Sequence, residues 1–172
     1  QLRIQQGAKH DISGNGNWTR EGILYFPNET PKLVRNSPIL ESAPQATRKG
    51  NEFYPTKEQI ERALVDSIDF PQENIEIPTN RLDSDALTVY AFGGEEQART
   101  YGEFLKNAGI LKMPVWAIDK NYINRQNNPF VRQMWFGDLH SRSGFYGDCW
   151  DIYNTIWLRG VKMGAEGTAP EK

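Results

Sequence analysis

The spacing of apolar positions predicts two helices in the middle of the chain. Thr56 is followed three residues later by Gln59, which is the spacing of a capping box, and the apolar residues that come next share one helical face. We therefore expect a helix over residues 56–67. A second helix is expected from Glu95 to Ala108, because acidic residues open it, apolar residues recur along one face, and Gly109 is placed to end it.

Short apolar runs predict the strands. Residues 87–92 (LTVYAF) are apolar, β-branched and aromatic, as in a buried strand, and residues 114–118 (PVWAI) form a second run of this kind. Residues 22–26 predict a further short strand, and residues 157–162 (WLRGVK) a strand near the end of the sequence. The glycines at 93–94 would form a strand-to-helix turn.

At 172 residues, 38% of them hydrophobic, the chain can bury one sizeable core, so we expect a single domain. Residues 1–50 are rich in Gly, Pro, Asn and Ser, which indicates irregular structure with short strands, and residues 69–85 read as a loop. Residues 163–172 indicate a loose tail. The sequence thus predicts an α+β domain with two helices, small antiparallel sheets and a loop-rich C-terminal half that displays a surface on irregular segments.

Composition and charge narrow the possible partners. A net charge of -2 provides no electrostatic attraction for nucleic acid or for an anionic membrane. No apolar run approaches the roughly 20 residues that a membrane-spanning helix needs. Cys149 is the only cysteine, so the chain cannot form an internal disulfide. We therefore expect neither a nucleic-acid partner nor a membrane span.

The most unusual stretch is 136–156, FGDLHSRSGFYGDCWDIYNTI, which contains no Lys, Glu, Gln or Met. The chain has 9 Lys, 13 Glu, 9 Gln and 3 Met, and all of them lie outside this window. At that outside frequency a stretch of this length would hold about four or five of them. Solvated surfaces normally use Lys and Glu heavily, so their absence is unusual; chance or a binding loop of paratope-like composition would explain it.

The segment RQMWFGDLHSRSGFYGDCWDIYNTIWLRGVK resembles the variable region of proteins diversified by diversity-generating retroelements, which use a C-type lectin fold. In that family a reverse transcriptase errs at template adenines and rewrites selected codons, typically AAC. An AAC codon randomised at both adenines cannot encode Lys, Glu, Gln, Met or Trp. The resemblance covers residues 53–162, with a variable region at 135–162, two helices at YPTKEQIERAL and EEQARTYGEFL, and a closing strand at WLRGVK.

The resemblance divides the window into variable and scaffold positions. The positions implied to be variable are His140, Ser141, Gly144, Phe145, Tyr146, Asp148, Cys149, Asp151, Tyr153, Asn154, Thr155 and Ile156. Those implied to be scaffold are Trp135, Arg142, Gly147, Trp150, Trp157, Arg159 and Gly160, with large aromatics that bury area and glycines that allow positive φ. Asp138, Ser143 and Ile152 fit either class.

The function implied by this resemblance is ligand binding without catalysis. A diversified C-terminal surface would recognise varying protein or glycan targets on another cell or particle, as a receptor-binding or surface-display protein of a virion or cell. Tyr and Phe side chains would provide rigid contact area, and Ser, Asp, Asn and Thr would provide adjustable hydrogen bonds. No cofactor is expected.

An enzyme and a metal site are alternatives built on the same residues. His140 and Cys149, with Asp148 or Asp151, contain the groups of a nucleophile, a base and an orienting acid. No glycine elbow or protease signature accompanies them. His140, Asp138, Asp148 and Asp151 also offer ligands to a cation, but the Glu-Pro-Asn or Gln-Pro-Asp triplet of sugar-binding lectins is missing. Solvated acids on a binding face are the preferred interpretation, with no metal bound.

Two further features have ordinary structural interpretations. The Gly93-Gly94 pair before a helix resembles part of a phosphate cradle, but it lacks a third glycine and a following Lys-Ser or Lys-Thr. Trp116 and Trp135 are expected in the core, as most tryptophans are largely buried. A conventional lectin-like binding domain that is not diversified remains a further alternative.

Overall fold

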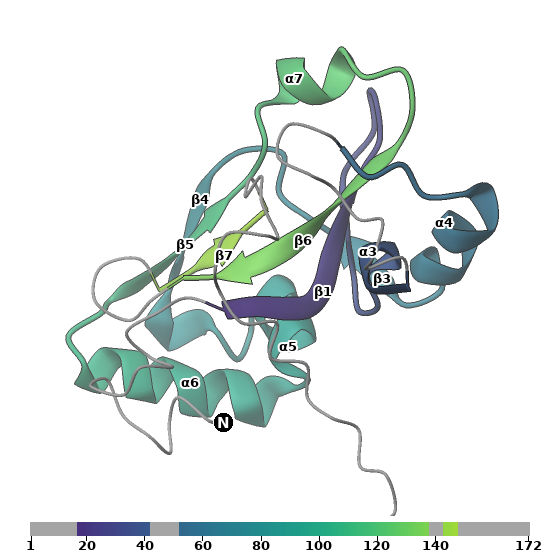
Figure 1. Cartoon of the computed structure of the whole chain (residues 1–172). Helices are drawn as coiled ribbons and strands as arrows, with labels where there is room; N and C mark the ends of the chain where they lie inside the picture. The colour runs from purple at the N-terminus through teal and green to yellow at the C-terminus, as the bar shows by residue number, and fades with distance from the viewer. Residues whose placement is uncertain (1–16, 42–51, 138–142, 148–172) are drawn as a thin grey trace, which may run out of the picture.

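A seven-stranded sheet organises the computed structural model, which describes residues 17–41, 52–137 and 143–147. Its strands are β1 (Asn17–Tyr25), β2 (Lys32–Val34), β3 (Ser67–Asp69), β4 (Ile75–Pro78), β5 (Lys112–Trp116), β6 (Phe130–Phe136) and β7 (Phe145–Tyr146). They lie in the order β3-β2-β1-β6-β7-β5-β4 (Figure 1). All neighbouring strands are antiparallel except β5 and β7, which are parallel.

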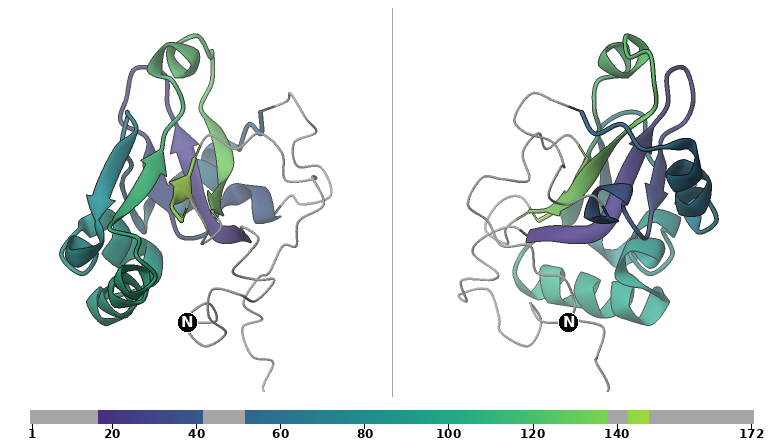
Figure 2. Two further views of the ribbon diagram at one scale, coloured as in Figure 1. Left: turned by 90° about the vertical axis from the view of Figure 1, so that its left-hand side faces the viewer. Right: turned by 45° about the vertical axis from the view of Figure 1, so that its right-hand side comes forward.

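Helices cover both faces of this sheet. The helices within the described ranges are α3 (Pro38–Glu41), α4 (Lys57–Leu64), the 3₁₀ turn η1 (Thr79–Arg81), α5 (Ala86–Phe92), α6 (Glu95–Asn107) and α7 (Lys120–Asn124). Helices α5 and α6 lie together on one side of the sheet, whereas α3 and α4 lie on the other side (Figure 2). The mixed α and β architecture is the one that the sequence predicts.

The central strands are buried on both faces because successive side chains point in opposite directions. Ile23 and Tyr25 of β1 enter the larger core under α5 and α6, and Leu24 between them enters a smaller core under α3 and α4. Phe130 and Val131 of β6 divide between the two cores in the same way. The β2-β1-β6 half of the sheet is therefore enclosed from both sides.

The helix predicted from the capping box is confirmed as α4. The Thr56 side chain accepts a hydrogen bond from the Gln59 backbone N–H at 3.3 Å, and the Gln59 side chain accepts one from the Thr56 N–H at 2.9 Å. The helix ends at Leu64 rather than at the predicted Ser67, because Ser67 begins β3 and pairs with Val34. The helix therefore ends earlier than its apolar periodicity predicts, because the following residues pair with the sheet.

The second predicted helix is confirmed as α6. Ala98, Tyr101 and Leu105 are buried along one face, and Gly109 with φ of 79° follows the helix end. The Ala108 N–H closes the last turn on Phe104 O at 3.1 Å. A glycine adopts this left-handed conformation without the steric cost that other residues incur.

The prediction of a strand over residues 87–92 was wrong, because this segment is helix α5. The Asp85 side chain caps the helix by accepting a hydrogen bond from the Thr88 N–H at 3.0 Å, and Gly93 closes it with φ of 84°. A run of six mostly apolar residues has too little periodicity to distinguish a strand from a buried helix, and here the capping residues favour the helix. The glycines at 93–94 therefore form a helix-to-helix turn rather than a strand-to-helix turn.

Two segments predicted as loops contain regular structure. Residues 69–85 include β4, which pairs with β5 through Ile77 and Met113, and also η1. The C-terminal half, which the sequence predicted to be rich in loops, contains α7, which Asp119 caps, and then β6. The edge strand β4 has only Ile77 buried, so its alternating pattern is too short to stand out from its polar surroundings.

Strand β6 is anchored by a buried ion pair. Arg132 donates to both carboxylate oxygens of Glu52, and the two side chains are only 5% and 7% exposed. The Tyr122 hydroxyl donates to Glu52 Oε1 at 2.6 Å, and the guanidinium lies 5.6 Å from the Tyr122 ring centroid. Burial raises the pKa of Tyr122, and its hydrogen bond to the carboxylate raises that pKa further. The network holds the start of β6 against the chain at Glu52.

A bulge between β1 and β6 is bridged by Gln133. The register of the two strands shifts between Trp18 and Gly22, so β1 bends away from regular pairing there. The buried Gln133 side chain donates from Nε2 to the Thr19 carbonyl and, at 2.9 Å, to the Glu21 carbonyl. Two backbone carbonyls that the bulge removes from the strand ladder thereby gain partners.

Loss of the Glu52 carboxylate should destabilise the fold strongly. We expect Glu52→Gln to lower the free energy of unfolding by about 3–5 kcal/mol, because the Arg132 guanidinium would stay buried without its counter-charge. The measurement is chemical denaturation at neutral pH. The matched control is Glu61→Gln, which removes the exposed ion pair with Lys57 and should cost less than about 1 kcal/mol. Equal effects of the two changes would contradict the anchoring role.

Candidate functional site

Strand β7 connects the predicted variable region to the sheet. Of residues 135–162, the structure describes 135–137 and 143–147. Tyr146 pairs with Trp135 of the antiparallel neighbour β6 and with Trp116 of the parallel neighbour β5. A two-residue strand that lies between two longer strands has its backbone position set from both sides.

The inner face of β7 belongs to the core. Phe145 is 2% exposed, and its ring lies 5.5 Å from Phe92 and 5.3 Å from Phe136 between centroids. The resemblance implied a variable, ligand-contacting Phe145, but the structure places its side chain in the packed interior. Pairing on both sides of β7 forces this alternation, which sequence spacing alone does not reveal.

Ser143 extends this inner face toward α6. Its side chain is 2% exposed, and its hydroxyl lies 2.9 Å from the hydroxyl of the buried Tyr101. A buried hydroxyl needs a hydrogen-bond partner, and here each of the two satisfies the other. Ser143 fitted either class from the sequence, and its surroundings are those of a scaffold residue.

Two glycines allow β7 to approach its neighbours closely. A Cβ atom at Gly144 would lie 2.1 Å from the backbone oxygen of Pro114, and one at Gly147 would lie 2.5 Å from the Tyr25 hydroxyl oxygen. Neither glycine has positive φ, so Gly147 is required for space and not for the conformational reason expected from the sequence. Gly144, which the resemblance implied to be variable, is more tightly constrained than Gly147, because the Pro114 backbone cannot move aside as a flexible side chain can.

Hydrogen bonds complete the attachment of this segment. The Gly147 N–H donates to Trp116 O at 2.8 Å, and the Gly147 carbonyl accepts from the Tyr25 hydroxyl at 3.1 Å. At the other end, the Gly137 N–H donates to Gly144 O at 2.9 Å. Residues 144–147 are thus hydrogen-bonded to the rest of the fold at both of their ends.

The outer face of β7 carries Tyr146 in a cross-strand line of large aromatics. Trp116, Tyr146 and Trp135 occupy directly paired positions on β5, β7 and β6, and we call these three residues the aromatic row. The Trp116 and Tyr146 rings are stacked with centroids 6.0 Å apart. Directly paired residues lie on one face of a sheet, so the row faces away from α5 and α6.

The position of Trp116 differs from the sequence expectation. This side chain is 38% exposed, whereas Met113 and Val115 of the same strand are fully buried. Trp135 is half-buried rather than a core residue. The alternation in KMPVW carried a signal that Trp116 points outward, but only the strand register shows which other aromatics accompany it.

Two charged sites lie on the strands that carry the aromatic row or pair with them. On β4 and β5 the exposed Glu76 and Lys112 form an ion pair of 2.6 Å. Glu21 lies in the β1 bulge beside β6, where burial raises its pKa, while backbone and Thr19 hydrogen bonds oppose the shift. The charges of Glu76 and Lys112 on β4 and β5 thus neutralise each other.

Most predicted site residues lie outside the described ranges. These are His140, Ser141, Asp148, Cys149, Asp151, Tyr153, Asn154, Thr155 and Ile156 among the variable positions, Arg142, Trp150, Trp157, Arg159 and Gly160 among the scaffold positions, and Asp138 and Ile152. The predicted closing strand at 157–162 lies outside them as well. The enzyme and metal alternatives rest on these residues and stay untested.

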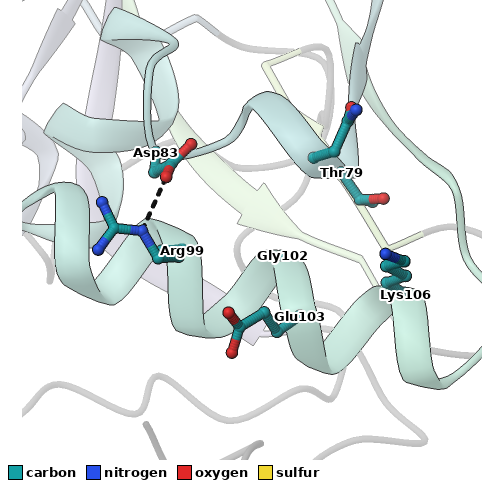
Figure 3. A pocket seen from close by; sticks show the side chains of 7 residues that line it. Thr79, Asp83, Arg99, Gly102, Glu103 and Lys106 are labelled. Carbon is teal, nitrogen blue, oxygen red and sulfur yellow. Dashed lines mark hydrogen bonds and ion pairs between the residues drawn. The ribbon is translucent and has the colours of Figure 1, made fainter.

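A hollow on the opposite side of the molecule contains none of the predicted site residues. It measures about 200 Å³ and lies between η1 and α6, lined by Thr79, Asn80, Asp83, Arg99, Gly102, Glu103 and Lys106 (Figure 3). Asp83 and Arg99 form an ion pair of 2.8 Å across it. A Cβ at Gly102 would lie 2.4 Å from Thr79 O, so the helix rests directly on the 3₁₀ backbone here. Helix packing explains this hollow.

Clusters of metal-ligating side chains and membrane-spanning helices are absent from residues 17–41, 52–137 and 143–147. Within these ranges no three His, Cys, Asp or Glu side chains gather to hold a metal ion. No helix in the same ranges has the length and apolar character to cross a membrane. The predictions about metals beyond these ranges remain predictions.

Comparison with solved structures identifies the fold. The chain matches a structure reported for the accommodation of massive sequence variation in Nanoarchaeota by the C-type lectin fold, with a TM-score of 0.63 and 20% identity. The match covers 85% of this chain and 76% of the other. The chain has a C-type lectin fold. The sequence matches no protein-family model and no curated protein.

The C-type lectin fold confirms the fold class predicted from the sequence. In this version of the lectin fold the described sheet is a single one of seven strands rather than several small ones, and α3, α5 and α7 accompany the two predicted helices. At 20% identity the likeness concerns the backbone arrangement. What the lectin fold recognises in this chain has to be argued from its own residues.

The two close-packed glycines should differ in their tolerance of a methyl group. We expect Gly144→Ala to destabilise by more than Gly147→Ala, because Pro114 O is backbone, whereas the atoms nearest Gly147 belong to the Tyr25, Ile23 and Phe70 side chains. Overpacking of this kind costs about 1–3 kcal/mol, and more where the backbone must shift. Thermal unfolding of both variants, with the exposed Asn107→Ala as control, measures the difference. A Gly144→Ala variant as stable as the control would contradict the geometry.

The Tyr101–Ser143 hydrogen bond should show strong coupling. Tyr101→Phe leaves the Ser143 hydroxyl buried without this partner, and Ser143→Ala does the same to Tyr101, so each change should cost about 1–3 kcal/mol. The double variant should cost clearly less than the sum of the two. Denaturant titrations of the three variants and the parent provide the cycle. Strict additivity would mean that the two hydroxyls do not interact.

Proposed function

We propose that this chain is a ligand-binding protein whose C-terminal surface is diversified by a retroelement to recognise varying targets. The surface consists of the aromatic row and the predicted variable residues that precede and follow β7 in the sequence. Its targets are proteins or glycans on another cell or particle. The chain would act as a receptor-binding or display protein on a virion or cell surface.

The observation that carries this proposal has two parts: certain residue types are absent from residues 136–156, and the described middle of that stretch is part of the sheet. Residues 136–156 lack Lys, Glu, Gln and Met, and the described middle of this window is bonded into a C-type lectin sheet. Loops that make few contacts with a ladder can change their side chains without breaking it, provided that a separate core holds their ends. A codon restriction would explain which residue types are absent from this stretch. Attachment to the sheet would explain how its other side chains can vary while the fold is kept.

The aromatic row suits a recognition role. Trp and Tyr dominate binding energy in protein interfaces because they bury large rigid areas at modest entropic cost. Trp116 and Tyr146 offer such area on one face of the sheet. The short polar side chains predicted around them, such as Ser141 and Asn154, would adapt hydrogen bonds to a particular target.

Fixed and changeable residues are interleaved in this surface. Trp116 lies outside the predicted variable region at 135–162, and a randomised AAC codon does not encode Trp. Both Trp116 and Trp135 would therefore stay constant, whereas Tyr146 could change. The proposed surface would then combine a constant aromatic part with a varied polar part. Constant aromatic area provides affinity for many targets, and the varied residues choose among them.

The nucleotide sequence provides the decisive test of diversification. We expect a near-repeat of the region that encodes residues 135–162 close to the gene, with a reverse-transcriptase gene nearby. Differences between the two copies should fall at adenines of the template copy and at the codons of predicted variable residues. The segment encoding residues 86–107 serves as an internal control that should have no second copy. Differences spread over all four template bases would exclude this mechanism and favour a conventional binding domain.

A further inference from the structure

We propose, on the basis of the proposed function, that Tyr146 is the specificity-determining position of β7. We further propose that its neighbours 143–145 and 147 are locked, by which we mean that packing or hydrogen bonds in the fold prevent them from being replaced. The resemblance treats Gly144, Phe145 and Tyr146 alike as variable. The geometry separates them, because only the Tyr146 side chain projects from the outer face of the sheet into the aromatic row.

Each neighbour of Tyr146 is locked by a different contact. Phe145 fills the core between Phe92 and Phe136, and Ser143 is hydrogen-bonded to Tyr101 in the interior. Gly144 and Gly147 have no room for a Cβ atom. Rewriting of these codons would remove a packing contact or force atoms apart and so lower the stability of the fold, whereas rewriting of codon 146 would leave every one of these contacts in place.

The backbone at position 146 is held whatever its side chain. The carbonyl and N–H of Gly147 both bond to groups outside β7, and Gly144 O accepts from the Gly137 N–H. None of these bonds uses the Tyr146 side chain. A new residue at 146 would therefore project from the same point of the surface, between the same two tryptophans, which is what a specificity position requires.

The chemistry of the row fits an uncharged, apolar patch on a protein partner. Interface cores are depleted in charge and enriched in Trp and Tyr, and their rims are polar. Here Trp116 and Trp135 flank position 146, and the exposed ion pair of Glu76 and Lys112 lies further along β4 and β5. An apolar side chain of the partner would contact Tyr146, and a short polar or acidic residue at 146 would select a different partner.

The folding half of the proposal can be tested without a ligand. Positions 144, 145, 146 and 147 are each randomised singly with NNC codons in the full chain, displayed, and sorted for folded protein after a heat challenge. Position 146 should accept most of the encoded residues. Positions 144 and 147 should return to Gly, and position 145 to Phe or Leu. A position 146 as restricted as 145, or a position 144 that accepts Ser and Asp, would overturn the assignment.

The role of Tyr146 in specificity is tested by selection against three model targets. Two libraries randomise the predicted variable positions 140, 141, 148, 151 and 153–155, one with Tyr146 retained and one with codon 146 also randomised. Both are selected against immobilised lysozyme, streptavidin and dextran. The second library should yield binders in which residue 146 of the lysozyme binders differs from residue 146 of the streptavidin binders. Exchanging residue 146 between the two sets of binders should weaken binding to each target at least tenfold.

The outcomes of the selection separate the inference from the proposed function. Binders that lose less than twofold in affinity on exchange at 146 would leave the proposed function intact and overturn the inference. Enrichment at 146 on dextran but on neither protein would overturn the protein partner in favour of a glycan. The absence of binders from both libraries would overturn the proposed function and this inference with it, while the folding sort would still report on the locked positions.

Discussion

The close approach of the β7 backbone to β5 and β1 is the constraint on which the candidate surface depends. Gly144 passes so near to Pro114 O, and Gly147 so near to the Tyr25 hydroxyl, that neither position has space for a side chain. This approach places a short parallel strand between β5 and β6 and closes the middle of the sheet. Without it, the aromatic row would not exist, because Trp116 and Trp135 belong to strands that are not neighbours.

The same constraint gives the residues of 143–147 two different roles. Side chains that point inward serve the core under α5 and α6, and the one that points outward stands between two tryptophans. Two further anchors on β6, the ion pair of Arg132 with Glu52 and the bridging of the β1 bulge by Gln133, hold the strand that supports β7. A rigid frame of this kind lets neighbouring residues change without loss of the fold.

Local signals in the sequence predicted the elements that local interactions define. The capping box at Thr56 and Gln59 and the apolar stripe before Gly109 correctly predicted α4 and α6, because caps and helical periodicity act within a few residues. Residues 87–92 were assigned to a strand because their composition favours one. Asp85 and Gly93, which cap the segment as a helix, were the missed local signals.

The amino-acid sequence by itself determined the α+β class, the likeness of the C-terminal region to a diversified lectin-type surface and the residue types present there. Only the tertiary structure decided which of the described residues there lie in the core and which lie on the outer face of the sheet. Phe145 and Tyr146 are adjacent in sequence and chemically alike, yet one is in the core and the other in the aromatic row. The physical reason is that the direction of a strand side chain and the space beside a glycine are set by neighbouring strands, which are distant in sequence.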